Sequence, residues 1–188
     1  MKAPEELHLS LQDNEWPKEY IDHDRQIVRA VVYDDDGGLW FMHAKRDDEF
    51  GNAELIETSG GGVEPGETEE AALLRELSEE LGIRAEIITT IGTVSDYYNL
   101  IHRHNLNHYY LCHVLAFEKT HMTDDEREQF HLQPVRRSAE EAEAEYRKAM
   151  RYPLGRLIAQ RELPVLEHAC RIMKKCGIYS EPELQTSE

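Results

Sequence analysis

The sequence predicts an α/β protein in which a mixed β-sheet is flanked by helices. Three observations predict this class: strand-like segments come early, one central helix follows, and further strands and two terminal helices close the chain. With 188 residues, of which 40% are hydrophobic, the chain is long enough to bury a core without disulfides. We expect one domain over residues 25–180, with an N-terminal extension over 1–24 and a flexible tail over 181–188.

The elements are expected in the following order. The β-branched stretch 26–33 predicts a strand, the DDDGG of 34–38 a turn, and 39–44 the returning strand of a hairpin. Residues 46–52 are expected to form a loop, and 53–58 a short segment that leads into a glycine-rich turn. After a central helix over 69–81, we expect strands over 86–94, 109–117 and 133–137 and helices over 139–150 and 157–175, with Pro164 starting or kinking the second part of the last helix.

The charge balance restricts the partners. Lys and Arg number 21 against 38 Asp and Glu, a net charge of −17, which disfavours nucleic acid and anionic membranes as ligands. No apolar run approaches the ~20 residues that cross a bilayer, and the first residues lack the apolar core of a signal peptide, so a cytoplasmic protein is expected. The three cysteines have no zinc-like spacing and are expected to be free thiols: Cys112, Cys170 and Cys176.

The central helix gathers its acidic residues on one face. At about 100° per residue, Leu74, Leu77 and Leu81 share an apolar stripe. The opposite side carries Ala72, Arg75, Glu76, Glu79 and Glu80. Thr68 is expected to cap the N-terminus of the helix and Gly82 to end it in the left-handed conformation.

Three carboxylates at this spacing destabilise a helix by about 0.2–0.5 kcal/mol per pair. A hard divalent cation such as Mg²⁺ reverses the sign of the interaction, because it prefers carboxylate oxygens and binds alongside phosphates. A solvated acidic face is the alternative in so acidic a chain. The glycine-rich stretch 60–66, which precedes the helix and allows close approach of the main chain to a ligand, favours the metal site.

The stretch from Gly61 to Ile83 resembles the Nudix box, G-x5-E-x7-R-E-U-x-E-E-x-G-U with U aliphatic. All nine defining positions match: Gly61, Glu67, Arg75, Glu76, Leu77, Glu79, Glu80, Gly82 and Ile83. The resemblance implies a Nudix-type α/β/α sandwich with a mixed sheet, here with extra C-terminal helices. It also implies hydrolysis of a nucleoside diphosphate linked to another moiety (a nucleoside triphosphate, ADP-ribose or a dinucleotide) with Mg²⁺ or Mn²⁺ as cofactor.

The resemblance further implies the roles of individual residues. The metal would be held by Glu76, Glu79, Glu80 and the main-chain carbonyl of Gly60, with Glu128 from a later loop as a further ligand. Arg75 would orient the glutamates, and Glu67 would brace the junction between loop and helix. The general base would be Glu76, Glu79 or a glutamate from a later loop, for which Glu128 is the first candidate and Glu126 the second.

A second cluster, residues 95–114, is rich in histidine and tyrosine. A zinc site at His104 and His108 is disfavoured, because the stretch reads as a loop entering a strand rather than as a helix. Its first half either packs in the core as part of a hairpin or lines the substrate-binding site. In the second case Tyr97 or Tyr98 stacks on a base, and Arg103 with His102 or His104 holds a phosphate. Arg46, at the end of the second strand, is a further phosphate-binding candidate, with a solvated strand end as the alternative.

Three other functions remain open. A prenyl-diphosphate isomerase of the same fold would use a catalytic cysteine and a modified box, and a ligand-sensing domain would lose box carboxylates. An RNA-end hydrolase is disfavoured by the net charge. The terminal helix is expected either to pack on the domain or to form the interface of a homodimer. The sequence does not choose among small diphosphate substrates.

Overall fold

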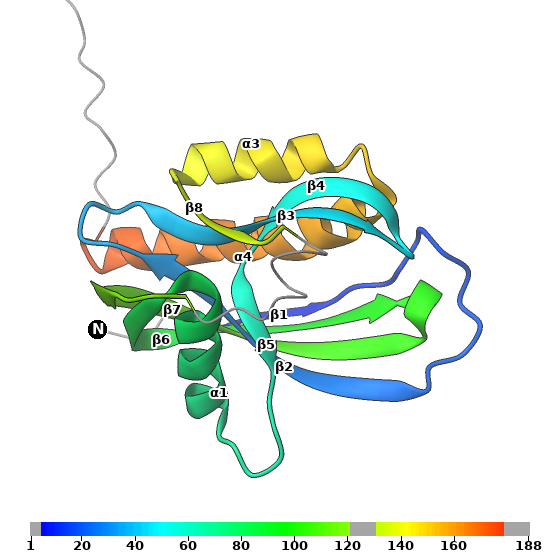
Figure 1. The fold of residues 1–188 in the computed structure, drawn as a ribbon, viewed down its shortest axis with the longest axis horizontal. Helices are drawn as coiled ribbons and strands as arrows, with labels where there is room; N and C mark the ends of the chain where they lie inside the picture. Colours follow the sequence, from blue (N-terminus) through cyan, green and yellow to red (C-terminus); the bar gives the residue numbers. More distant parts are fainter. Residues whose placement is uncertain (1–4, 121–130, 179–188) are drawn as a thin grey trace, which may run out of the picture.

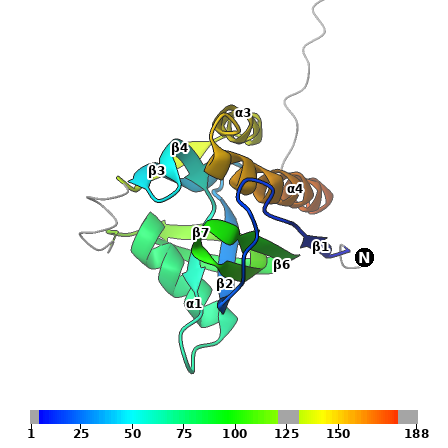
Figure 2. The same ribbon diagram turned by 90° about the vertical axis from the view of Figure 1, so that its right-hand side faces the viewer.

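The computed structural model describes residues 5–120 and 131–178. Eight strands form one sheet: β1 (Leu7–Ser10), β2 (His23–Tyr33), β3 (Leu39–Asp48), β4 (Gly51–Glu57), β5 (Ser59–Gly62), β6 (Ile83–Tyr98), β7 (Arg103–Phe117) and β8 (Gln133–Arg137). The helices are α1 (Glu69–Glu76), which continues as a π-helical turn (Leu77–Leu81), a short 3-10 helix (Asn99–Ile101), α3 (Ala139–Ala149) and α4 (Pro153–Lys175). Helix α1 lies on one side of the sheet and α3 and α4 on the other (Figure 1, Figure 2).

The sheet is mixed, as expected, with strand order β1-β6-β7-β2-β3-β4. Strands β2 and β7 pair in parallel, as do β1 and β6, whereas β6–β7 and β3–β4 are antiparallel. Only the end of β2 pairs with β3, at Val32 and Tyr33, and its middle, Ile27 to Ala30, pairs with β5 instead. Strands β3 and β5 therefore diverge from their shared neighbour β2, and a cavity lies between them.

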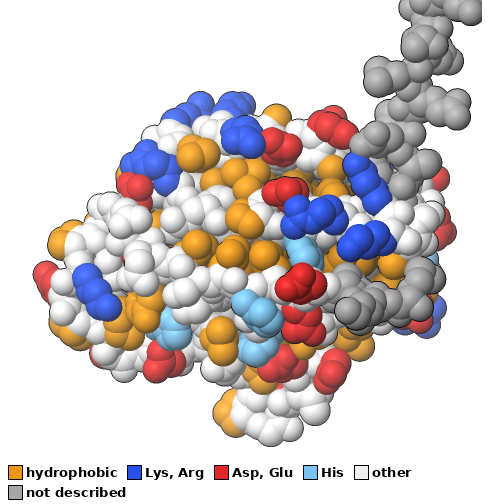
Figure 3. Space-filling model, turned by 180° about the vertical axis from the view of Figure 1, so that it is seen from behind, with side chains coloured by type: hydrophobic (Ala, Val, Ile, Leu, Met, Phe, Trp, Pro, Cys, Tyr) orange, Lys and Arg blue, Asp and Glu red, His pale blue; other side chains and the backbone are white. Residues whose placement is uncertain are grey.

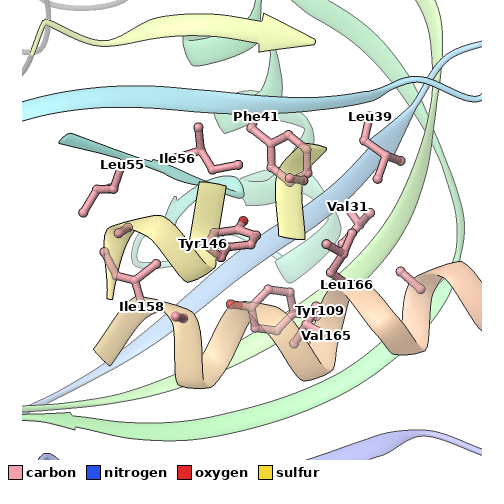
Figure 4. Packing of buried hydrophobic residues seen from close by; sticks show 14 of the residues in the cluster. Val31, Leu39, Phe41, Leu55, Ile56, Tyr109, Tyr146, Ile158, Val165 and Leu166 are labelled. Atoms are coloured by element: carbon pink, nitrogen blue, oxygen red, sulfur yellow. The ribbon is translucent and has the colours of Figure 1, made fainter. Parts of the chain in front are cut away.

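Two apolar layers hold the sheet between its helices. One layer joins β2, β3, β6 and β7 to α3 and α4 and contains the edge-on pair Phe41 and Tyr146, whose ring centroids are 6.2 Å apart (Figure 4). The other joins the opposite face of the sheet to α1 and the π-helical turn through Leu73, Leu77 and Leu81. Seen from behind, most of the Lys and Arg side chains in view lie on the upper part of the molecule, His and several Asp and Glu side chains lie lower, and apolar atoms are exposed between them (Figure 3).

Several boundaries differ from the expectations. Residues 46–52 are mostly strand, because β3 runs on to Asp48 and β4 starts at Gly51; the Asp48 carboxylate accepts the Phe50 N–H at 3.0 Å and closes the tight turn. The histidine- and tyrosine-rich stretch lies in a long β6–β7 hairpin, as the hairpin alternative expects, and is not a loop that enters a strand. Pro164 lies inside a continuous α4, which starts at Pro153.

The N-terminal extension adds to the sheet. Strand β1 pairs in parallel with β6, which the sequence reading missed because the strand is only 4 residues long. Further along, the buried carboxylate of Asp13 accepts the Asn99 N–H at 2.7 Å. The proposed tail over 181–188 lies outside the described residues. No helix in the described part of the chain is long and apolar enough to cross a membrane.

Candidate active site

The glutamate helix, which consists of α1 and the π-helical turn that follows it, is not a uniform α-helix. Thr68 caps α1 by accepting the Ala71 N–H at 3.2 Å, but after Glu76 the helix widens into the π-helical turn, which ends at Gly82 (φ 62°). The buried residues are Ala72, Leu73, Leu77 and Leu81, whereas Leu74 is 40% exposed. Leu77 and Leu81 are therefore buried as expected, but Leu74 is not, and Ala72 lies with the buried residues rather than on the acidic side. Single π-helical turns of this kind are frequent at functional sites.

Two of the carboxylates lie directly against the glycine strand. A Cβ atom on Gly61 would stand 2.3 Å from Glu76 Oε1, so only glycine permits this approach. Glu80 accepts hydrogen bonds from the Ser59 hydroxyl at 2.6 Å and from the Gly60 N–H at 3.1 Å. Gly60 itself has φ +148°, and a Cβ there would meet the Val28 carbonyl oxygen at 2.0 Å. The glycines thus bring carboxylates and main-chain groups together at one point.

Burial changes the acidity of this site. The pKa of Glu80 is raised to about 7, mainly because burial disfavours its charged form, and the nearby charge of Glu76 adds to the effect. Hydrogen bonds from Ser59 and Gly60 and the positive charge of Arg29 act in the opposite direction. An additional positive charge at this point would favour the ionised form of Glu80.

Arg75 organises the remaining acidic side chains. Its guanidinium donates to both carboxylate oxygens of Glu67 at 3.0 and 3.1 Å, and to Glu76 and Glu79 at 2.8 and 3.3 Å. Arg75 also donates to the carbonyl oxygen of Gly62 at 3.2 Å, which ties the helix to the loop before it. The hydrogen bond from Arg75 holds the pKa of Glu67 below its usual value.

The donor set fits a hard divalent cation in its chemistry. Within residues 5–120 and 131–178, no three His, Cys, Asp or Glu side chains are gathered closely enough to hold a metal. Arg75 donates hydrogen bonds to both Glu76 and Glu79, and Glu80 accepts one from Ser59. The groups that could bind a cation here are nevertheless all oxygens, which Mg²⁺ prefers. Because Gly61 has no side chain, the carboxylate of Glu76 can lie directly against the loop. Glu128 and Glu126 lie outside the described residues.

A cavity of about 160 Å³ occupies the space between β3 and β5. It is lined by Arg29, Met42, Ala44, Arg46, Glu57, Thr58, Gly60, Glu80 and Leu132. Glu57 lies between two arginines, with its carboxylate 3.8 Å from the guanidinium nitrogens of both Arg29 and Arg46. Arg46 also pairs with Asp48 at 2.6 Å. The structure therefore brings Arg46, Gly60 and Glu80 together in one cavity that carries both positive and negative groups.

The other proposed substrate-binding residues do not line this cavity. Tyr98 is only 6% exposed, and its ring packs edge-on to Phe50 with centroids 5.9 Å apart, so its face is not offered to a base. Arg103 and His104 are neighbours on β7 and point to opposite faces, so they cannot hold one phosphate together. Arg103 lies over the Tyr98 ring, and His104 is bonded to Asp24 and Ser95 at 2.6 and 2.8 Å.

Sequence reading missed three polar residues of the cavity, Arg29, Glu57 and Thr58. Arg29 had a usable signal, since it is the one charged residue in the otherwise apolar core of the stretch QIVRAVVY. Glu57 and Thr58 had none, because their role depends on the divergence of β3 from β5, which is a tertiary feature.

Comparison with known proteins places this geometry in a family. The family model of the NUDIX domain matches residues 23–155. CTP pyrophosphohydrolase of Escherichia coli (strain K12) is 42% identical over 62 residues, which are 33% of this chain and 44% of that protein, so the match spans less than half the length of this relative.

Solved structures share the architecture. A NUDIX hydrolase from Nitrosomonas europaea aligns with a TM-score of 0.59 and 19% identity over 88% of this chain and 98% of its own. An ADP compounds hydrolase aligns with a TM-score of 0.59 and 22% identity over 82% of this chain and 76% of its own. At these identities the structures support the shared fold alone. The family model, however, covers more than half of the chain and includes the complete glutamate motif, and the chain therefore belongs to the Nudix hydrolase family.

Proposed function

We propose that the protein is a metal-dependent pyrophosphohydrolase that cleaves the diphosphate bond of a nucleoside diphosphate linked to another moiety. The observation that carries the proposal is the approach of Glu76 and Glu80 to the backbone of Gly60 and Gly61 beside an arginine-lined cavity. The similarity to a CTP pyrophosphohydrolase puts nucleoside triphosphates first among the substrates, followed by ADP-ribose and dinucleotides.

A Mg²⁺ or Mn²⁺ ion would neutralise the diphosphate oxygens and lower the pKa of the attacking water. Glu76, Glu79, Glu80 and the carbonyl of Gly60 are the groups that would hold it. Arg75 would keep the glutamates in place, and Glu67 would fix Arg75.

The proton of the attacking water needs an acceptor. We favour Glu79 over Glu76, because the Glu79 side chain is 44% exposed and can reach water, whereas that of Glu76 is 14% exposed and lies closer to Arg75. Arg46, with Arg29 beside it, would donate to the phosphate oxygens and offset locally the repulsion from a chain of net charge −17.

An isomerase that uses a catalytic cysteine fits less well. Cys112 is fully buried in β7, and burial raises the pKa of its thiol to about 12. A thiol in that state is neither a nucleophile nor accessible to a substrate.

A turnover panel with Mg²⁺ and Mn²⁺ tests the proposal. The substrates would be CTP and other nucleoside triphosphates (normal and oxidised), ADP-ribose, NADH, dinucleoside polyphosphates and nucleotide sugars, with phosphate and nucleotide products both assayed. We expect hydrolysis of at least one substrate that depends on metal and is lost in Glu79→Gln. The matched control is Glu143→Gln, which changes an exposed glutamate of α3 and should leave turnover unchanged. A blank panel with a folded protein would overturn the assignment to nucleotide substrates.

A further inference from the structure

Two consecutive charged residues of α4, Arg161 and Glu162, are almost completely buried, with exposures of 0% and 1%. They lie in an apolar stretch of the helix, LIAQRELPV, which packs on the sheet. The Arg161 guanidinium contacts Asp96 and the Tyr98 hydroxyl, both at 2.9 Å, and Glu162 at 3.0 Å. Glu162 also accepts the Tyr109 hydroxyl at 2.9 Å.

Such a cluster is costly to maintain. Well-packed apolar residues in place of a buried ion pair are often neutral or more stabilising, because the charges lose their hydration. Neither Arg161 nor Glu162 belongs to the glutamate motif or lines the cavity. Stability alone therefore does not explain the pair.

Both residues reach the wall of the cavity. Arg161 lies 3.5 Å from the carboxylate of Glu57, and Glu162 accepts the Thr58 hydroxyl with both oxygens at 3.1 Å. Glu57 and Thr58 are adjacent and both line the cavity. The Thr58 carbonyl oxygen in turn accepts a hydrogen bond from Arg29 at 3.0 Å.

Ser59 and Gly60, which follow Thr58 in the chain, are held from the side opposite α4. Ser59 and Gly60 both donate to Glu80, at 2.6 and 3.1 Å. The four residues 57–60, here called the floor segment, are thus fixed by α4 at one end and by the glutamate helix at the other.

We propose that Arg161 and Glu162 are positioning residues that hold the floor segment, and with it the Gly60 carbonyl and Glu80, in the arrangement that the active site needs. The inference rests on the proposed function, because it concerns the same cation and the same reaction. In this proposal α4 supports the active site in addition to packing on the hydrophobic core. Groups that orient metal ligands from behind typically contribute about 10–100-fold in metal affinity or activity.

The test uses the Thr58–Glu162 contact in the full-length protein. Thr58→Val removes the hydroxyl at nearly constant shape, Thr58→Ser keeps it, and Glu162→Gln removes the charge from the other partner. Tyr109→Phe is the matched control, since it removes the second hydroxyl that Glu162 accepts without touching the floor segment. For each variant one would measure the Mn²⁺ dissociation constant by electron paramagnetic resonance, kcat and KM, and the free energy of unfolding in urea.

We expect Thr58→Val and Glu162→Gln each to weaken Mn²⁺ binding and lower kcat by about tenfold or more, with a double variant less impaired than the product of the two effects. Thr58→Ser should restore both quantities, and Tyr109→Phe should change only the stability. Wild-type Mn²⁺ affinity and kcat in Thr58→Val, or equal losses in Tyr109→Phe, would overturn the proposal.

The two proposals fail in different ways. A wild-type protein that binds Mn²⁺ but hydrolyses nothing would overturn the proposed function alone, and the Mn²⁺ affinities of the variants would still decide the positioning role. A wild-type protein that binds no Mn²⁺ would overturn both.

Discussion

Glu79→Gln and Glu80→Gln are each expected to lower kcat by about two to three orders of magnitude, in the range found when one preorganised electrostatic group is removed from an active site. Glutamine has nearly the same shape but no negative charge to hold a cation. The fold should survive, because Glu79 is partly exposed and an amide oxygen at position 80 can still accept the Ser59 and Gly60 hydrogen bonds. The measurement is steady-state turnover at saturating Mg²⁺, with urea unfolding as the check on stability.

The control for this pair of variants is Glu143→Gln on α3, which should behave as the wild type. Near-wild-type turnover in either motif variant at saturating Mg²⁺ would show that the glutamate in question does not hold the metal. A loss of turnover accompanied by unfolding would instead indicate a structural role.

Arg161→Ala is expected to destabilise the protein by about 3–5 kcal/mol. The change leaves the carboxylates of Asp96 and Glu162 buried, at 2% and 1% exposure, without the guanidinium that contacts both. Urea unfolding provides the measurement. Arg171→Ala, which removes an exposed arginine paired with Glu167 on the same helix, should cost less than about 1 kcal/mol.

A cost of less than about 1 kcal/mol for Arg161→Ala would mean that water reaches this cluster or that its carboxylates become protonated. In that case the buried pair could not hold the floor segment rigidly.

The sequence was sufficient for features that depend on local pattern. The strand over 133–137 has the expected bounds, and the expected sheet and C-terminal helices are present. The motif from Gly61 to Ile83 identified the family because its spacing is encoded in consecutive residues.

Features that depend on tertiary contacts could not be predicted. The π-helical turn Leu77–Leu81 has no signal in the sequence, and within α1 the buried residues are Ala72 and Leu73, whereas Leu74 is 40% exposed. The histidine- and tyrosine-rich stretch around Tyr98 suggests a substrate contact. In the structure the Tyr98 hydroxyl instead accepts a hydrogen bond from Arg161, which lies 63 positions away along the chain. No local pattern indicates a contact of that separation.

The measurement that tests the central claim most directly is the thermal unfolding of the wild type, Glu79→Gln and Glu80→Gln with and without Mn²⁺. If the glutamate cluster is a cation site, metal at ten times its dissociation constant should stabilise the wild type by about 1.4 kcal/mol, or raise its Tm by roughly 3–6 °C, and both variants should respond much less. An unchanged Tm of the wild type at millimolar Mn²⁺, or equal shifts in all three proteins, would contradict the assignment of a metal site to Glu79 and Glu80.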